Sequence, residues 1–456
     1  MKLKEKRNVP TTQPHMFSNA DLWKLMLPLS IDQLLNSMMG TVGTMIVSNL
    51  GSAAISAVSL VDSINVLVVQ AFYALAAGGS VICSQFLDCK RPKEARKAAE
   101  QLVFITLILS IIIGSICSFF NKPLLKLIFG DVEPDVMTYA RQYFMISALS
   151  YPFIALYDDG SSIFRAQENS NLPMKISLLA NVLNLILNLL FVWGFHMGVI
   201  GSALATFISR GFSITVVLYE LHKPGWLISL QKYASIRPSW QQIRRILYLG
   251  IPSGIENSMF QFGKLVIQST VSMMGTTSIA AQGMTNILEN LNGIMAIGIG
   301  VGLMTVVGEC IGAGRKDEAI YYIKKMTAVS EIVIIGSCLL IFALVRPITH
   351  FGGMEPESAR MCIFMVTCIT IVKPLVWVLS FIPAYGFRAA GDVKFTMGVS
   401  AASMWICRVS LAMFLARVLG FGPIAVWIGM FTDWSVRAII FTIRFRNGKW
   451  LEHKII

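Results

Sequence analysis

The chain has 456 residues, of which 55% are hydrophobic and only 14% are charged. Ordinary soluble domains carry about 25% charged residues, so this composition excludes a soluble globular fold. The formal net charge of +13 does not indicate nucleic-acid binding, because Lys and Arg gather in the polar segments between apolar runs. Those runs have helix length and lack the alternation of barrel strands, which predicts an all-α polytopic membrane protein.

In chain order, the sequence predicts twelve transmembrane helices, six in each half of the chain. The predicted spans are residues 22–48, 54–80, 101–120, 138–161, 172–193, 199–219, 243–272, 278–306, 322–345, 359–384, 394–416 and 422–443. They divide the chain into a cytoplasmic N-terminal tail (1–21), an N-lobe (22–219), a cytoplasmic linker (220–242), a C-lobe (243–443) and a cytoplasmic C-terminal tail (444–456). We therefore expect two six-helix lobes.

The two halves repeat one another at a fixed offset of 224 residues. This offset places Leu27-Pro28 on Ile251-Pro252, and the segment 91–95 on the segment 315–319. An apolar chain built from two equivalent halves is typical of a transporter whose site lies between or within the halves. Because each half has an even number of spans, the lobes are expected to be parallel and pseudo-symmetric about an axis near the membrane normal.

Basic residues mark one side of the predicted membrane. They concentrate in both tails, in the linker, and in the connections that follow the second and the eighth span. One connection on the opposite side, residues 131–135, is acidic. By the positive-inside rule both termini of this multi-pass protein are expected in the cytoplasm.

Polar side chains inside the predicted spans are the candidate functional residues, because such groups usually face a cavity or a partner. The first span carries Asp32 and Asn36 on one face, and the seventh carries Glu256 at the repeat position of Asp32. The second span carries Asp62 and Asn65. The eighth span carries their repeat counterparts, Asn286 and Glu289. Repeat symmetry favours a functional role for these residues, although hydrogen bonding between helices is the structural alternative for each one.

Other intramembrane polar residues lack this symmetry. They are Asn184 and Asn188 in the fifth span, Lys264 in the seventh and Lys373 in the tenth. Arg408 and Arg437 are expected to snorkel or to form structural ion pairs. The adjacent acids Asp158 and Asp159 are expected to be solvated at the cytoplasmic end of the fourth span.

The chain carries the motifs Leu27-Pro28, Ser84-Gln85-Phe86, Phe164-Arg165-Ala166, the run from Gly198 to Thr206 and the run from Gly308 to Gly314. In their order and spacing in both halves, these motifs resemble the multidrug and toxic compound extrusion (MATE) family. The resemblance implies two six-helix lobes around a V-shaped cavity, in a protein of the cell (inner) membrane. It also implies efflux of small organic, often cationic, compounds by alternating access, in exchange for inward H⁺ or Na⁺.

The chain departs from the family pattern at two positions. Gly43 and Asn188 stand where family members often carry Asp, while Thr206 matches the family's sixth-span Thr. We therefore hypothesise that cation coupling has moved to Asp32, Glu256, Asp62 or Glu289. Bound Na⁺, if the coupling ion is sodium, is expected near Asn184, Asn188 or Glu256. A second hypothesis is that Lys264 and Lys373 make the C-lobe cavity tolerant of anionic or zwitterionic compounds.

Two other functions stay open at this point. One is a flippase for lipid-linked or polar precursors with the same two-lobe plan, and a more remote one is a membrane receptor or scaffold without a transport cycle. No nucleotide-binding loop or nucleophile motif is present, so neither an enzyme nor a cofactor is expected, and the eight cysteines have no metal-binding spacing. The expected partners are a small-molecule substrate and the lipid bilayer, not nucleic acid. A monomer suffices when one chain holds both lobes.

Overall fold

The computed structural model describes residues 15–48, 52–129, 134–230, 238–272, 274, 276–351 and 354–452. Over these ranges the fold is helical, and the only β-type pairing among them is an isolated bridge between Pro224 and Trp226. The N-lobe contains α1 (Asn19–Ser48), α2 (Ser52–Asp88), α3 (Pro92–Phe119), α4 (Asn121–Phe129), α5 (Pro134–Leu149), α6 (Tyr151–Ala166), α7 (Asn171–Asn188), η1 (Leu189–Gly194) and α8 (Gly198–His222). The C-lobe contains α9 (Trp240–Ser272), α10 (Thr276–Gly312), α11 (Lys316–Phe351), α12 (Pro356–Ala389), α13 (Val393–Ser403), η3 (Met404–Ser410), α14 (Leu411–Arg417) and α15 (Ile424–Arg446).

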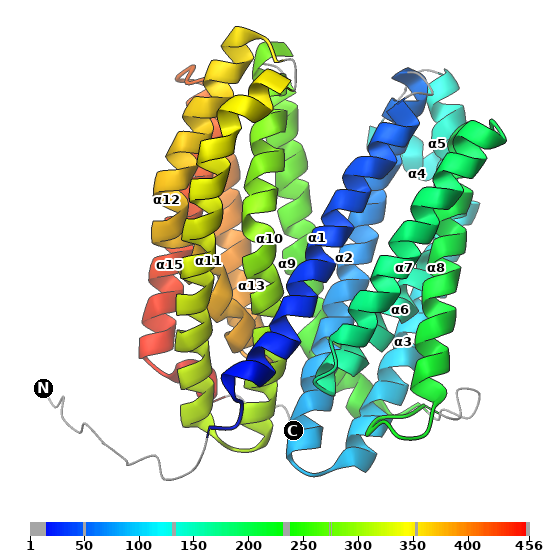
Figure 1. The fold of residues 1–456 in the computed structure, drawn as a ribbon, viewed down its shortest axis with the longest axis vertical. Helices are drawn as coiled ribbons and strands as arrows, with labels where there is room; N and C mark the ends of the chain where they lie inside the picture. The colour runs from blue at the N-terminus through cyan, green and yellow to red at the C-terminus, as the bar shows by residue number, and fades with distance from the viewer. Residues whose placement is uncertain are drawn as a thin grey trace, which may run out of the picture.

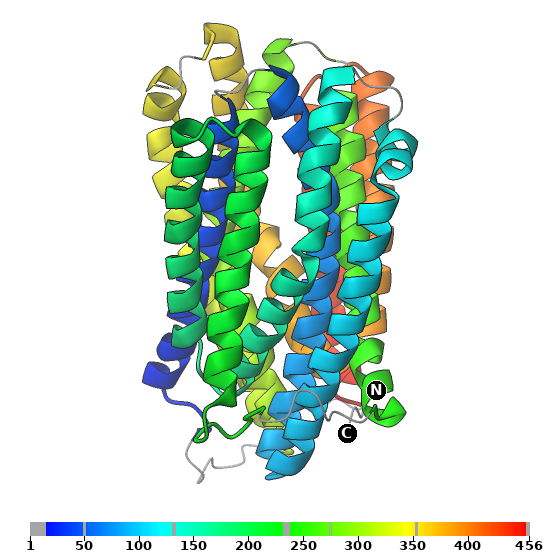
Figure 2. The same ribbon diagram turned by 90° about the vertical axis from the view of Figure 1, so that its right-hand side faces the viewer.

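The predicted twelve membrane passes are confirmed, and so is the two-lobe architecture. The helices of each lobe run along the long axis, and the lobes converge at the end that holds the α2–α3 and α10–α11 turns (Figure 1). The view turned by 90° shows the helices of the N-lobe in front of the C-lobe (Figure 2). Nine helices within the described ranges are long and apolar enough to cross a membrane by length and composition.

The sequence repeat corresponds to equal elements in the two lobes. Helices α2 and α10 each have 37 residues, and both ends of α10 lie 224 positions after those of α2. Both helices extend beyond the predicted spans 54–80 and 278–306. The C-terminal ends of both helices are more polar, which lowers their hydropathy, but the helices continue there because these ends pack against the other lobe.

The fourth and fifth passes differ from the predicted continuous helices. The predicted span 138–161 is divided at Ser150 into α5 and α6, and Pro152 in the first turn of α6 has no backbone N–H to continue the ladder. The fifth pass ends in the π-helical segment η1, and the eleventh pass contains a second one, η3. Segments of this kind often occur at functional sites, and η3 carries Arg408.

Close backbone approach holds the two lobes together, both at the narrow end and farther along α10. A Cβ atom at Gly312 would lie 2.5 Å from the backbone oxygen of Gln85, and one at Gly298 would lie 2.5 Å from Cα of Ser30. The Gln85 side chain also donates a hydrogen bond of 2.8 Å to the backbone oxygen of Ala389. Small residues let helices approach this closely inside a membrane, so the inter-lobe contact depends on glycine at these positions.

Candidate functional site

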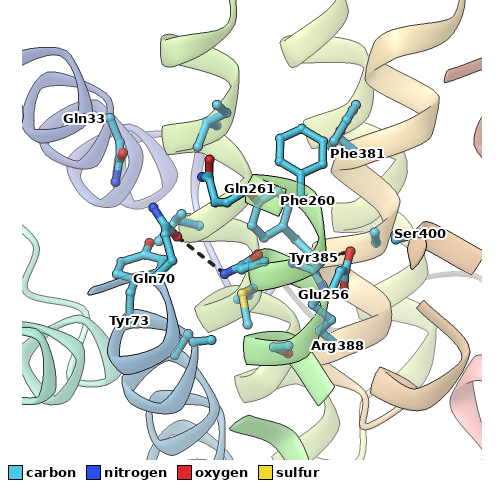
Figure 3. Close-up of a pocket in the computed structure, with 18 of the residues that line it drawn as sticks. Gln33, Gln70, Tyr73, Glu256, Phe260, Gln261, Phe381, Tyr385, Arg388 and Ser400 are labelled. Atoms are coloured by element: carbon cyan, nitrogen blue, oxygen red, sulfur yellow. Dashed lines mark hydrogen bonds and ion pairs between the residues drawn. The ribbon is translucent and has the colours of Figure 1, made fainter. Parts of the chain in front are cut away.

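A cavity of about 570 Å³ lies between the two lobes. Helices α1, α2 and α6 supply its N-lobe wall, and α9, α10, α12, α13, η3 and α15 supply its C-lobe wall. Figure 3 shows Gln33, Gln70 and Tyr73 on the N-lobe side and Phe260, Phe381 and Ser400 on the C-lobe side. Mixed apolar, aromatic and polar walls of this size suit a small organic compound.

The N-lobe wall carries two acids, Asp32 and Asp158, and one base, Arg165. The prediction for the Asp158-Asp159 pair was wrong, because both side chains are buried and Asp158 lines the cavity. Helix α6 packs against α2, α3 and α8, and these helices exclude water from the face on which the pair lies. The sequence held a signal for this placement, since Asp158 and Arg165 lie seven residues apart and thus share a helix face.

Asp158 and Asp159 differ in their partners. Asp159 accepts a hydrogen bond of 3.4 Å from the Thr106 hydroxyl. Oδ2 of Asp158 is buried and has no hydrogen-bond partner among the described residues. The cavity therefore contains a buried carboxylate oxygen that is available to a cation or a polar ligand.

The predicted C-lobe acids are each held by a base. Glu256 accepts a hydrogen bond of 2.6 Å from the guanidinium of Arg388 (Figure 3). Glu289 accepts one of 2.8 Å from Nζ of Lys373, which is fully buried and also donates to the Glu289 backbone oxygen at 3.1 Å. Glu256 and Glu289 line the cavity, but their charges are already compensated within the lobe.

Lys264 and Arg408 lie on the same C-lobe wall. Nζ of Lys264 is 4.9 Å from the centroid of the Phe260 ring, and Cζ of Arg408 is 5.0 Å from it.

The predictions for Arg408 and Arg437 have different outcomes. Arg437 does form a structural ion pair, with a distance of 2.8 Å to Asp433. Arg408 neither snorkels nor forms a salt bridge within the described residues, because η3 turns its buried side chain toward the cavity.

The predicted pair of Asp62 and Asn65 lies in the N-lobe away from the cavity lining. Asp62 and Asn65 are 3.2 Å apart, and Tyr143 and Tyr151 donate hydrogen bonds to them at 3.3 and 2.8 Å. This closed network matches the structural alternative stated for such residues.

The asparagine group of the fifth pass also lies outside the cavity lining. Asn188 donates hydrogen bonds of 3.0 Å to the backbone and side-chain oxygens of Asn184, and Asn184 donates one of 3.4 Å to Thr206.

Asn286, in α10, accepts a hydrogen bond from Gln282 at 3.3 Å. Asn36 lies within α1, and so does Thr44, which follows Gly43. The side chains of Asn36 and Thr44 lie outside the described part of the structure. No group of three or more His, Cys, Asp or Glu residues within the described ranges is arranged to hold a metal ion.

Comparisons with known proteins agree with this architecture. The MatE family model matches the chain twice, over residues 28–190 and 252–414, and the two matches are offset by the 224 residues of the repeat. A probable multidrug resistance protein NorM of Thermotoga maritima is 24% identical over 96% of this chain and 94% of its own length. The multidrug export protein MepA of Staphylococcus haemolyticus is 23% identical over 82% of this chain and 83% of its own length.

Solved structures show the same fold. A crystal structure of a MATE protein in complex with MaL6 superposes with a TM-score of 0.88 and 17% sequence identity, over 94% of this chain and 95% of that one. The repeated family match covers most of the chain and falls on both lobes that enclose the cavity. This multi-pass membrane protein belongs to the MatE family, the multidrug and toxic compound extrusion family that its motifs resemble.

Proposed function

We propose that this protein exports small organic compounds from the cytoplasm by alternating access, in exchange for inward H⁺ or Na⁺. The observation that carries the proposal is a single cavity lined by both lobes, with acids on the N-lobe wall. The cavity lies where two helix bundles meet at one end only, so a rocking motion of the lobes would expose it to either side of the membrane (Figure 1). The names of the relatives, which refer to multidrug resistance and export, support the same function.

We assign the coupling role to Asp32 and Asp158. Among the four acids hypothesised from the sequence, Asp32 is the one on the N-lobe wall of the cavity; Glu256 and Glu289 lie on the C-lobe wall, and Asp62 does not line the cavity. Asp32 lines it together with Asp158, which the sequence hypothesis did not include. A carboxylate in such a cavity attracts either the coupling ion or a cationic compound, and this competition gives exchange.

The proposal is tested with the purified protein in proteoliposomes that carry an imposed H⁺ or Na⁺ gradient. We expect a labelled organic cation to move against the imposed ion flux, and we expect Asp32→Asn to reduce this gradient-driven transport at least tenfold. The matched variant Asp62→Asn, in the same lobe but outside the cavity lining, is expected to retain it. Transport that is equally fast without a gradient, or is unchanged in Asp32→Asn, would contradict the coupling role. Translocation of a labelled lipid in place of the cation would instead indicate a flippase, and transport of neither would indicate a scaffold.

A further inference from the structure

The charges on the two walls of the cavity are unequal. The N-lobe wall carries Asp32, Asp158 and Arg165, an excess of one negative charge. On the C-lobe wall, and in contact with it, three acids are each paired with one base. These pairs are Glu256 with Arg388, Glu289 with Lys373, and Asp433 with Arg437. Lys264 and Arg408 remain in addition, so the C-lobe wall has an excess of two positive charges.

Neither Lys264 nor Arg408 forms a salt bridge within the described part of the chain; Glu289 attracts both only at longer range, and it is already paired with Lys373. Arg408 is only 5% exposed, and its Nε atom is buried without a hydrogen-bond partner. Lys264 contacts the Phe260 ring, with Nζ 4.9 Å from the ring centroid. Cζ of Arg408 lies 5.0 Å from the same centroid, so the two cations are near each other and their like charges repel. A cation–π contact offsets only part of the cost of burying an unpaired charge.

We propose that Lys264 and Arg408 form a subsite for the carboxylate of a zwitterionic or anionic organic compound. The inference rests on the proposed function, because the compound must enter this cavity. A guanidinium binds the two oxygens of a carboxylate with a planar pair of donors, and a nearby ammonium adds a point charge. The apolar body of the compound then lies against Phe260, Phe381 and Trp377, which line the same wall.

The opposite wall completes the recognition. In Figure 3, Phe260 and Phe381 lie across the cavity from Gln70 and Tyr73. Asp32 and Asp158 are on that N-lobe side, so a cationic group of the same compound faces acids while its carboxylate faces bases. The hypothesis from the sequence assigned anion tolerance to Lys264 and Lys373. The present proposal retains Lys264 but replaces Lys373 with Arg408, because the ammonium of Lys373 already donates a hydrogen bond to Glu289.

The test uses a rhodamine dye with a free carboxylate and the methyl ester of the same dye, which differ only in the negative charge. Binding of each dye to the purified full-length protein is measured by fluorescence polarisation. We expect the wild type to bind the free carboxylate, and we expect Lys264→Gln and Arg408→Gln each to weaken that binding at least tenfold. Binding of the methyl ester should change less than threefold, and Lys264→Arg should restore binding of the carboxylate.

The control variant is Lys394→Gln. Nζ of Lys394 lies 5.0 Å from the Tyr248 ring in the same lobe, a similar cation–π contact, but Lys394 is exposed and does not line the cavity. This variant should leave binding of both dyes unchanged. Equal losses for carboxylate and ester, or no loss for either, would overturn the subsite. A wild type that binds the ester but not the carboxylate would overturn the subsite and leave export standing, whereas a wild type that binds neither dye would overturn the proposed function as well.

Discussion

At the scale of single residues, the C-lobe buries several charged side chains as pairs of acid and base. Lys373 is fully buried, and its ammonium lies 2.8 Å from Glu289 and 5.0 Å from the Trp377 ring. Two charges taken out of water are stable only when each has a well-placed partner and further hydrogen bonds. The additional bond from Lys373 to the Glu289 backbone oxygen, at 3.1 Å, supplies one of these. The pair therefore fixes α12 against α10.

We predict that Lys373→Met destabilises the protein strongly, because it leaves the carboxylate of Glu289 buried without its main partner. The expected cost is about 3–5 kcal/mol, the range for breaking one side of a buried pair. The double variant Lys373→Met/Glu289→Gln should recover most of the loss, because it removes both charges together. Thermal unfolding in detergent measures the three variants.

A control variant separates this effect from the general loss of a lysine. Lys223 and Glu220 form an exposed pair at 2.6 Å, which water screens, so Lys223→Met should leave the unfolding temperature nearly unchanged. If Lys373→Met proves equally mild, the pair does not hold these two helices together.

At the scale of elements, the C-terminal ends of α2 and α10 are repeat equivalents with one chemical difference. Gln85 in α2 donates a hydrogen bond of 2.8 Å to the backbone oxygen of Ala389 in the other lobe. Its counterpart 224 residues later is Glu309, which is 3% exposed. The Oε1 atom of Glu309 is buried and has no hydrogen-bond partner within the described ranges. An ionised carboxylate only accepts hydrogen bonds, whereas the amide of a glutamine also donates them.

We predict that Glu309→Gln stabilises the inter-lobe contact, because it removes a carboxylate oxygen that is buried without a described partner and adds an amide donor. The unfolding temperature of Glu309→Gln in detergent should therefore be higher than that of the wild type, by a change that corresponds to about 1 kcal/mol, one ordinary hydrogen bond. The reciprocal variant Gln85→Glu loses the amide donor to the Ala389 backbone oxygen and should have a lower unfolding temperature. Identical unfolding temperatures for all three proteins would contradict this account.

At the scale of the whole molecule, the narrow end of the V carries the basic connections. The α2–α3 and α10–α11 turns lie there together (Figure 1), with Arg91 and Arg315 next to them. The start of α5, with Asp135, lies at the wide end. By the positive-inside rule, we propose that the narrow end faces the cytoplasm and that the cavity of this conformation opens toward the outside.

We predict that a cysteine at Lys93 is labelled by a membrane-impermeant maleimide only in inverted vesicles, and a cysteine at Asp135 only in intact cells. Both native side chains are exposed, so access to the reagent depends on the side of the membrane alone. The parent protein without either substitution measures background labelling of the native cysteines. Labelling of both positions from the same side would refute the proposed orientation.

The sequence by itself determined the helical class, the twelve passes and the division into two lobes. Lipid offers no hydrogen-bond partner to the backbone, so long apolar runs must be helices, and the 224-residue offset requires two equivalent units. Only the tertiary structure decided which polar side chains share the cavity. Periodicity gives the face of a helix on which a residue lies, but not the neighbour that this face meets. The pairing of Glu256 with Arg388, 132 positions away, and the exposure of Asp158 and Arg408 to the cavity depend on how separate helices are rotated against each other.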